Sequence, residues 1–286
     1  MPHIFERSGL AALSDLESPG WREVVALLET QQAEFLAKES AFRSPGYKWP
    51  RDPLHTWSRV WEYPYVYHHV KVQRSKWRAE ALPHVVDVGS GVTFFPFSAA
   101  RLGYQVTCAD IDPVCGTDIP RAARVLSHGP GTVAFRLIER EALPFQNNSI
   151  DAVYCISVLE HIRDAEKTVI EIQRILKPGG LFLLTIDLDL QGDSTIGVVA
   201  HRKLVEALKL YFDYELPEVT VHPSDILDNT KGPFRTRTRS GLTRDWFLLK
   251  QIIKPWFAKP ATPLLPFHLA VQGFVLTRKA DDPQQW

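Results

Sequence analysis

Short apolar segments alternate with helix-like segments between about residues 83 and 190, and this alternation constrains the fold more than any other feature. Four runs read as buried strands: HVVDVG at 84–89, YQVTCAD at 104–110, DAVYCIS at 151–157 and LFLLTID at 181–187. Segments of helical spacing separate them, such as FFPFSAARLG and AEKTVIEIQRIL, and KPGG ends the second of these. Nearly continuous apolar strands joined by helices predict an α/β fold with a mostly parallel sheet covered on both faces.

The chain divides by pattern into an N-terminal helical and aromatic cap, residues 1–82, and a larger domain, residues 83–286. Within the larger domain, HRKLVEALKLYF at 201–212 predicts a helix, and LAVQGFVLTRK near the end alternates like a final strand. The irregular, proline-rich stretch at about 215–264 predicts an insertion or lid, because structureless loops of this length are uncommon in compact domains.

The cap begins with a helical pattern. Ser18 is placed as the N-cap of this helix and Pro19 as its first residue. The loop 43–53, rich in proline, then leads to the aromatic run HTWSRVWEYPYVYHHV at 55–70. The run fits a helix, whose length Pro64 would limit, and an extended segment equally well.

The composition argues against several classes of partner. Lys and Arg number 33, as do Asp and Glu, so the chain has no net field to attract nucleic acid or an anionic membrane. Cys108, Cys115 and Cys155 have no paired spacing, which indicates a reducing compartment. The N-terminus lacks the pattern of a signal peptide, and no apolar run approaches the ~20 residues of a membrane span. We therefore expect a cytoplasmic protein.

The segment DVGSGVTFFPF at 87–97 predicts a strand, a tight turn and a helix. Gly89 and Gly91 allow a tight turn and a close approach of the backbone to a ligand. Thr93 stands where a third glycine would suit a methyl-donor loop, and we place it as the N-cap of the following helix. A tight turn without any ligand is the alternative interpretation.

The next predicted strand ends in CADID, which places Asp110 nineteen residues after Gly91. An acidic side chain at this point can accept hydrogen bonds from both hydroxyls of a ribose. A helix cap is the alternative. Loop and acid together indicate a nucleoside but do not choose between cofactors.

Four segments in order resemble the class I S-adenosylmethionine-dependent methyltransferases: VVDVGSG, VTCADIDP, ALPFQNNSIDAVYCISVLEHI and EIQRILKPGGLFLLTID. The resemblance covers roughly residues 84–187, about a third of the chain. It implies a Rossmann-like methyltransferase fold with a final antiparallel strand, and S-adenosyl-L-methionine as the cofactor.

The resemblance also implies roles for single residues. Residues along the methionine part would be Asp87, Gly89, Ser90 and Gly91. Asp110 would bind the ribose, Ile111 would pack on the adenine, and Glu139 would contact the adenine amino group. Ile156 and Ser157 would line the cofactor and face the acceptor. Two positions depart from the family: Thr93 replaces a glycine, and IERE at 138–141 replaces a GDA-like run.

Methyl transfer from a sulfonium is an in-line displacement, so the protein must mainly align the acceptor with the methyl group. A base is needed only where the acceptor must lose a proton near neutral pH. His161 and His201 are the candidates for this base, and a structural or capping role is the alternative for each.

The aromatic run offers an acceptor pocket. The resemblance would place an N-terminal segment over the active site as a cover, with Trp57, Arg59, Trp61, Tyr63 and Tyr65 lining the pocket. Arg59 would be available for an anionic group. Core packing of the cap against the sheet is the alternative.

No metal is expected. Glu160-His161 resembles part of a Glu…Glu-His metal set of some quinone-pathway O-methyltransferases, but Ser157 stands at the position of the first glutamate. Losing one carboxylate weakens a site for a hard cation, although Asp187 and Asp189 could lend oxygens. RTRTR at 235–239 is interpreted as a solvated loop, with binding of an acidic group as the alternative.

The sequence thus predicts methylation of a small molecule, at oxygen, in a biosynthetic pathway. CISV stands where amino-methylating enzymes of nucleic acids and glutamine carry an NPPY-type tetrapeptide. A Rossmann oxidoreductase that uses NAD and a catalytically inactive methyltransferase-like binding module are the alternatives. Nothing in the sequence indicates an oligomeric state.

Overall fold

A mixed sheet forms the centre of the molecule in the computed structural model, which describes residues 3–78, 82–139, 142–162, 164–190, 196–236 and 269–280. Its strand order is β1-β8-β6-β5-β2-β3-β4, and β7 also pairs with β8. The parallel strands are β2 His84–Val88, β3 Gln105–Asp110, β4 Thr132–Leu137, β5 Ile150–Ile156 and β6 Leu176–Asp189. The antiparallel strands are β1 Gly9–Leu10, β7 Phe212–Tyr214 and β8 Leu269–Arg278.

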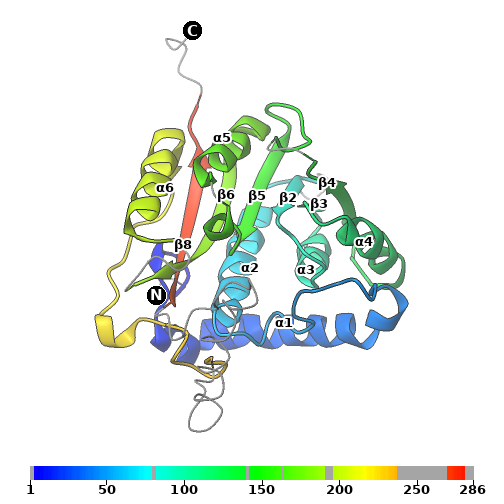
Figure 1. Ribbon diagram of the computed structural model, residues 1–286, viewed down its shortest axis with the longest axis horizontal. Helices are drawn as coiled ribbons and strands as arrows, with labels where there is room; N and C mark the ends of the chain where they lie inside the picture. Colours follow the sequence, from blue (N-terminus) through cyan, green and yellow to red (C-terminus); the bar gives the residue numbers. More distant parts are fainter. Residues whose placement is uncertain are drawn as a thin grey trace, which may run out of the picture.

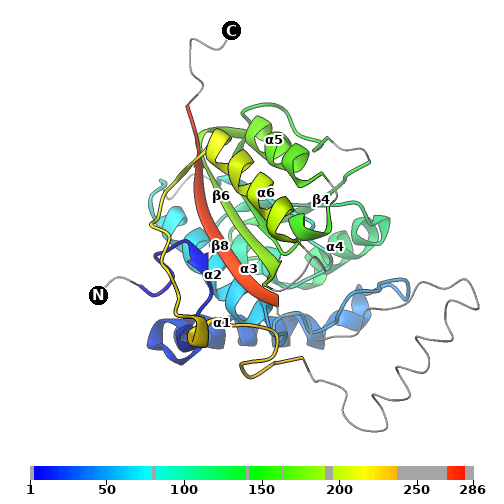
Figure 2. The same cartoon turned by 60° about the vertical axis from the view of Figure 1, so that its left-hand side comes forward.

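Helices cover both faces of this sheet (Figures 1 and 2). One face carries α5 Ala165–Ile175 and α6 Val198–Tyr211, and the other carries α2 Arg59–Ser75, α3 Phe95–Arg101 and α4 Pro113–Val125. The long helix α1 Pro19–Ala37 crosses outside α2 and α3. Short 3-10 turns are η1 Leu13–Glu17, η2 Glu39–Ala41, η3 Leu159–His161 and η4 Pro223–Asp225. The predicted α/β fold with a final antiparallel strand is confirmed.

The start of α1 follows the local chemistry of its first residues. Ser18 Oγ accepts a hydrogen bond from the backbone N–H of Trp21 at 3.1 Å, and Pro19 is the first helical residue. The hydroxyl satisfies one of the backbone donors that the first turn leaves unpaired, so this prediction is confirmed.

The start of α3 does not depend on a polar cap. Phe94 is the N-cap of α3, and no side chain bonds the first turn, so the prediction of Thr93 as the cap was wrong. Phe94 and Phe95 are each 1% exposed, and the ring of Phe95 stacks on Tyr63 at 4.9 Å between centroids. Packing of the aromatic rings fixes the helix start where a capping side chain would otherwise do so.

Helix α2 continues past its internal proline to Ser75, so the expectation that Pro64 limits the length of this helix was wrong. A proline inside a helix has no N–H for the carbonyl four residues earlier, which here belongs to Val60. Trp21 on α1 replaces the missing donor, because its indole Nε1–H donates to Val60 O at 2.8 Å. Residues 60–70 of α2 are all buried.

The N-terminal segment is continuous with the larger domain. β1 pairs with the middle of β8, and β7 pairs with the end of β8, so both complete the same sheet edge. Four helices and strands were not predicted: α4, β1, β4 and β7. Of the predicted lid, residues 237–264 lie outside the described residues, as does most of the RTRTR stretch, and the predicted domain boundaries stay predictions. None of the described helices is long and apolar enough to cross a membrane.

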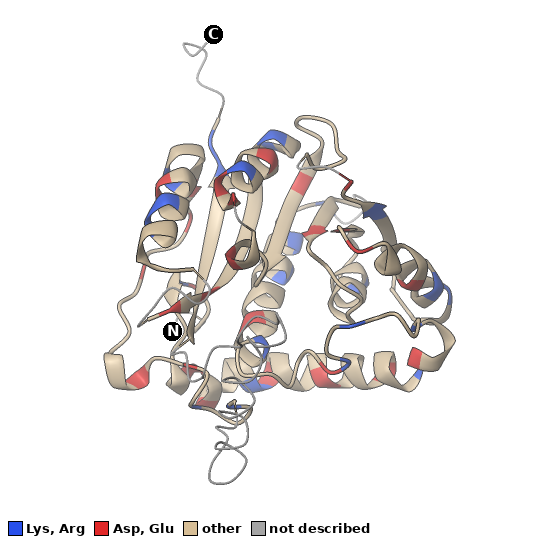
Figure 3. Ribbon diagram, in the orientation of Figure 1, with Lys and Arg blue, Asp and Glu red and all other residues tan. Residues whose placement is uncertain are grey.

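Charged residues of both signs are interspersed over the outer helices α4, α5 and α6 (Figure 3). This distribution agrees with the balanced composition of 33 basic and 33 acidic residues.

Candidate functional site

The loop after β2 combines one closely packed glycine with one open glycine. Gly89 has φ 73°, and a Cβ added there would lie 2.4 Å from Cγ2 of Val158. Gly91 has φ 53°, and the nearest atom to an added Cβ is Tyr47 Oη at 3.4 Å. Both residues adopt a backbone conformation that glycine favours. Gly89 therefore serves close packing, whereas Gly91 leaves the backbone open to an approaching ligand.

Asp110 joins the loop to the end of β3. Its Oδ2 accepts from Gly91 N at 2.8 Å and its Oδ1 from Asp112 N at 2.9 Å. Each carboxylate oxygen retains a second lone pair for a ligand hydroxyl. The neighbouring Ile111 is 76% exposed, which leaves an apolar surface beside the carboxylate. Glu139 is exposed directly beyond Ile138, whose N–H donates to Asp110 O at 2.9 Å.

A segment from the N-terminal part covers this loop. Tyr47 Oη accepts from Val92 N at 3.2 Å, and Arg43 Nη1 donates to Val92 O at 3.2 Å. The guanidinium of Arg43 lies 4.3 Å from the centre of the Tyr47 ring. Neither residue could be identified from the sequence, because the pattern of residues 43–53 indicates only a loop.

Ser157 marks the end of β5 with an unusual backbone. Its φ is +46°, a left-handed conformation that a non-glycine residue adopts at a cost of about 1–3 kcal/mol. Its N–H donates to Thr185 O at 3.0 Å, and its Oγ donates to Glu62 Oε1 at 2.7 Å. Glu62 lies on α2 and is fully buried, and its carboxylate also pairs with Arg59. Glu62 was not expected as a site residue from the sequence.

Two further carboxylates lie at the same ends of β5 and β6. Glu160 Oε1 accepts from the backbone N–H of Asp187 at 3.1 Å. Glu160 is 7% exposed, and its Oε2 is buried without a hydrogen-bond partner in the described part of the chain. Burial raises the pKa of Glu160 to about 7. Burial, aided by the charges of Glu62 and Glu160, raises the pKa of Asp187 well above its ordinary value.

Comparisons with known proteins find methyltransferases that are similar to part of this chain. The family described as "Methyltransferase domain" matches residues 86–184. A ubiquinone biosynthesis O-methyltransferase of Xanthomonas oryzae pv. oryzae is 40% identical over 108 residues, which are 36% of this chain and 43% of that protein. The enzyme of the same name from Xanthomonas campestris pv. campestris is 38% identical over 112 residues, 37% of this chain and 45% of that protein.

Residues 86–184 thus match a methyltransferase domain, which supports a class I S-adenosylmethionine-dependent methyltransferase. The chain spans less than half the length of the relatives that it matches, so the activity of those relatives cannot be assigned to it from this similarity. Among solved structures, the chain is similar to the [4+2]-cyclase SpnF, with 19% identity, 96% of this chain and 100% of that chain covered, and a TM-score of 0.48. The match to a methyltransferase domain favours a methyltransferase over the nicotinamide oxidoreductase that the loop sequence also allowed.

The geometry of the loop fits the donor of this methyltransferase family. Gly91 offers an open backbone for the methionine part, Asp110 offers carboxylate lone pairs for a ribose, and exposed Ile111 offers an apolar face for adenine. Asp87 and Ser90 are buried beside the same loop, and burial raises the pKa of Asp87 well above its ordinary value. The roles of these residues, and of Ile156 and Glu139, stay predictions.

The two candidate histidines lie in different surroundings. His161 lies on η3, where partial desolvation of its ring, together with the charge of Arg59, lowers its pKa. His201 lies on α6, and its Nε2 bonds Oε1 of Gln272 at 2.8 Å. Gln272 pairs with Ile186 on β6, so both side chains lie on the face of the sheet that α6 covers. Asp187 follows Ile186 along the strand, so its side chain lies on the opposite face, which α2 covers. His201 is therefore outside the carboxylate cluster, and the catalytic role of either histidine stays a prediction.

The predicted aromatic pocket separates into two groups. Trp61 is 1% exposed, and its Nε1 donates to Asp15 Oδ2 at 2.8 Å. Tyr65 is fully buried, stacks on Trp61 at 4.5 Å and donates to Arg7 O at 2.9 Å. These two rings lie in the core, because α2 turns them toward the N-terminal segment and β8. Their contact with an acceptor stays a prediction.

Arg59 and Tyr63 lie on the part of α2 that faces the strand ends. Arg59 interacts with the charges of Glu62 and Asp187, and Tyr63 interacts with those of Arg59 and Asp87. Trp57 is partly buried just before α2. Contact of these three residues with an acceptor stays a prediction.

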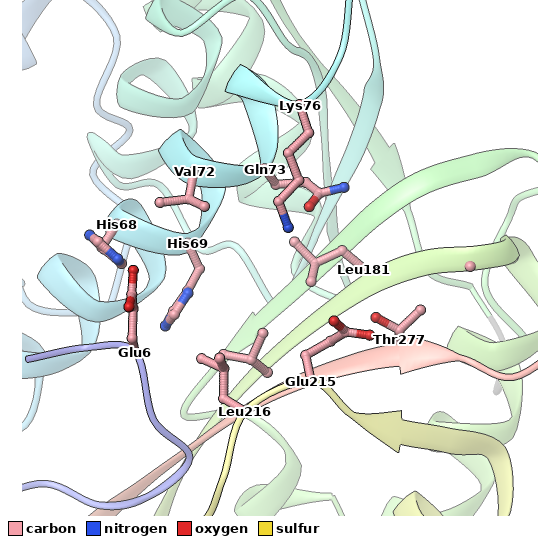
Figure 4. A pocket seen from close by; sticks show the side chains of 12 residues that line it. Glu6, His68, His69, Val72, Gln73, Lys76, Leu181, Glu215, Leu216 and Thr277 are labelled. Carbon is pink, nitrogen blue, oxygen red and sulfur yellow. The ribbon is translucent and has the colours of Figure 1, made fainter. Parts of the chain in front are cut away.

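A pocket of about 220 Å³ lies elsewhere, between α2, the start of the parallel part of β6 and the end of β8 (Figure 4). Leu181 on β6 and Thr277 on β8 line the pocket and pair with each other. Leu181 lies six positions before Asp187 on β6. At about 3.3 Å per residue, the pocket is roughly 20 Å from the strand ends that carry the loop. It is thus separate from the candidate site. Among the described residues, no group of three or more His, Cys, Asp or Glu is arranged to hold a metal ion.

Proposed function

We propose that this protein transfers a methyl group from S-adenosyl-L-methionine to a hydroxyl of a small molecule. The observation that carries the proposal is the open Gly91 backbone bonded to Asp110 beside the exposed Ile111, within the part of the chain that matches the methyltransferase family. This combination offers one partner each to the methionine, ribose and adenine parts of the donor.

Methylation at oxygen is supported by the names of the relatives and by the chemistry of the strand ends. The relatives are ubiquinone biosynthesis O-methyltransferases, although they match over only 36% of this chain. Carboxylates at the ends of β5 and β6 are suited to accept a hydroxyl proton during transfer. We place the enzyme in a biosynthetic pathway of the cytoplasm, and we expect the acceptor to be neither a nucleic acid nor a membrane component.

Calorimetry tests the donor site directly. S-adenosylhomocysteine, the product that keeps the donor's adenosine and amino-acid parts, should bind with a dissociation constant in the micromolar range, and NADH should not bind. Binding of NADH without S-adenosylhomocysteine would refute the proposal.

Mass spectrometry tests the transfer step. Incubation with S-adenosyl-L-methionine and a panel of phenols and alcohols should increase the mass of an acceptor by one methylene group. Binding of the donor with no turnover on hydroxyl, amine or thiol panels would instead favour an inactive binding module.

A further inference from the structure

The pocket between α2, β6 and β8 is large enough for a small organic molecule. Its volume is about 220 Å³, and water occupies ~30 Å³ per molecule in the liquid, so the pocket has room for a ligand of about seven non-hydrogen atoms. It lies roughly 20 Å from the loop after β2, at the opposite ends of the strands. The proposed methyl transfer therefore does not use this pocket.

The floor of the pocket is apolar. Leu181 on β6 and Val275 on β8 lie on the same face of the sheet, because Leu181 pairs with Thr277, two residues after Val275. Leu216 after β7 and Val72 on α2 also line the pocket. A ligand with an apolar body would gain free energy by removing this floor from water.

The polar groups of the pocket lie at two ends (Figure 4). The first, which we call the histidine end, consists of Glu6, His68 and His69. The second, the lysine end, consists of Gln73, Lys76, Glu215 and Thr277. His68 and Lys76 are eight residues apart on α2, which corresponds to about 12 Å along a helix. The lysine end contains one carboxylate and one ammonium, whereas the histidine end contains one carboxylate and no cation.

The histidine end has acceptors that lack a donor. His68 is 9% exposed, and its Nε2 is buried without a hydrogen-bond partner in the described part of the chain. Nε2 of His69 bonds Phe5 O at 2.8 Å and must be the donor, so Nδ1 of His69 is an acceptor. The exposed carboxylate of Glu6 has no ion-pair partner among the described residues.

Neighbouring groups do not supply the missing positive charge. Burial lowers the pKa of His68 to about 4, so its ring is neutral at pH 7 and has one unprotonated nitrogen. Burial also lowers the pKa of His3, which stacks on His68. The charge of Lys71 acts on His68 as well, but Lys71 is exposed and does not line the pocket. The histidine end therefore favours a ligand group that donates hydrogen bonds and carries a positive charge.

We propose that this pocket binds a small primary amine, whose ammonium group donates to Glu6, His68 and His69 and whose apolar body covers Leu181 and Val275. An ammonium has three donors and no acceptor, which matches one acceptor on each of the three residues. A carboxylate ligand would be repelled by Glu6, and a hydroxyl has a single donor. This inference does not depend on the proposed methyl transfer.

Three probes with the same alkyl chain test the class of ligand. Hexylamine, hexanol and hexanoate differ in the head group alone, and an alkyl ammonium with a pKa near the ~10.4 of lysine is charged at pH 7. In ligand-observed NMR titrations, hexylamine should bind with a dissociation constant about fivefold lower than that of hexanol, and hexanoate should bind more weakly than hexanol. A hexylamine affinity no higher than that of hexanol would overturn the inference.

Matched variants at the two ends locate the ammonium group. Glu6→Gln should reduce the preference for hexylamine over hexanol to about twofold or less, because it removes the negative charge of the histidine end. Glu215→Gln, at the lysine end, should keep the wild-type preference. Both glutamates are exposed, so neither change disturbs the core. An equal loss of preference in the two variants would mean a general attraction to negative charge and would overturn the placement.

A variant that fills the pocket shows whether the amine binds inside it. Val72→Trp should weaken hexylamine binding by about tenfold or more, and urea unfolding checks that the variant is folded. An unchanged affinity in the folded variant would place the amine elsewhere and would contradict the proposal. S-adenosylhomocysteine should bind equally well with and without hexylamine, whereas its failure to bind at all would remove only the proposed function.

Discussion

Two glycines with a left-handed backbone, Gly91 in the loop after β2 and Gly179 within β6, allow a ligand-binding role to be distinguished from a structural one. Gly91 has φ 53° and Gly179 has φ 74°. The nearest atom to an added Cβ lies at 3.4 Å at Gly91, and none lies within 4 Å at Gly179. Alanine at either position should lower the free energy of unfolding by about 1–2 kcal/mol, because the left-handed backbone disfavours a Cβ.

Only Gly91→Ala should also weaken binding of S-adenosylhomocysteine, by about tenfold or more, since its Cβ projects from the backbone that the ligand approaches. Calorimetry on both variants, with urea unfolding to compare their stabilities, measures the two effects separately. An equal affinity of the two variants would show that the ligand does not approach Gly91.

At the level of elements, α2 depends on a donor from another helix. In Trp21→Phe, the buried Val60 carbonyl loses the indole N–H that replaces the missing N–H of Pro64. Urea unfolding should show a loss of about 1–3 kcal/mol in addition to the small change in ring volume.

A double-mutant cycle provides the control for this variant. In a Pro64→Ala background the helix regains its own donor, so Trp21→Phe should be markedly less destabilising there. The same cost in both backgrounds would mean that the indole does not compensate for the proline.

The elements that could be predicted from the sequence are those whose signal is local. β2, β3, β5 and β6 are buried on both faces, so each is a continuous apolar run. β4 lies at the sheet edge with alternating partial exposure, and β1 and β7 have two and three residues, so their signals are weak.

The candidate site likewise has one part with a local sequence signal and one part without such a signal. The loop with Gly91 and Asp110 is coded within about twenty residues, whereas Glu62 meets Ser157 across 95 residues of sequence. No local pattern could reveal that pair, nor the donation from Trp21 to Val60, which spans 39 residues. The long extent of α2 and the buried carboxylates were missed for this reason.

At the scale of the whole molecule, the N-terminal segment is held to α2 by neutral histidines. The ring of His3 stacks on His68 at 3.9 Å, and Nε2 of His69 bonds Phe5 O at 2.8 Å. Since a carbonyl can only accept, Nε2 of His69 is the protonated nitrogen. Burial lowers the pKa of His68 to about 4 and that of His69 to about 3. The attachment of the N-terminal segment therefore depends on histidines that resist protonation.

This dependence predicts how stability changes with pH. The unfolded chain protonates these histidines near pH 6.5, whereas the folded protein does so only near pH 4 and 3. Between these values the unfolded state binds more protons, so the stability contribution is full above pH 6.5 and is lost as the pH falls. Between its unfolded and folded pKa values, each histidine should lower the free energy of unfolding by up to about 1.4 kcal/mol for each pH unit of acidification.

His69→Gln isolates one of these contributions, because glutamine keeps an N–H donor for Phe5 O and cannot take up a proton. The free energy of unfolding of this variant, measured by urea at pH 7.5 to 4.5, should fall less steeply below pH 6.5 than that of the wild type. Carboxylates such as Glu160, whose raised pKa of about 7 has the opposite effect, are present in both proteins and cancel in the difference. His222→Gln, at an exposed histidine before η4, should keep the wild-type slope. If His69→Gln also keeps that slope, protonation of His69 does not limit the attachment of the N-terminal segment.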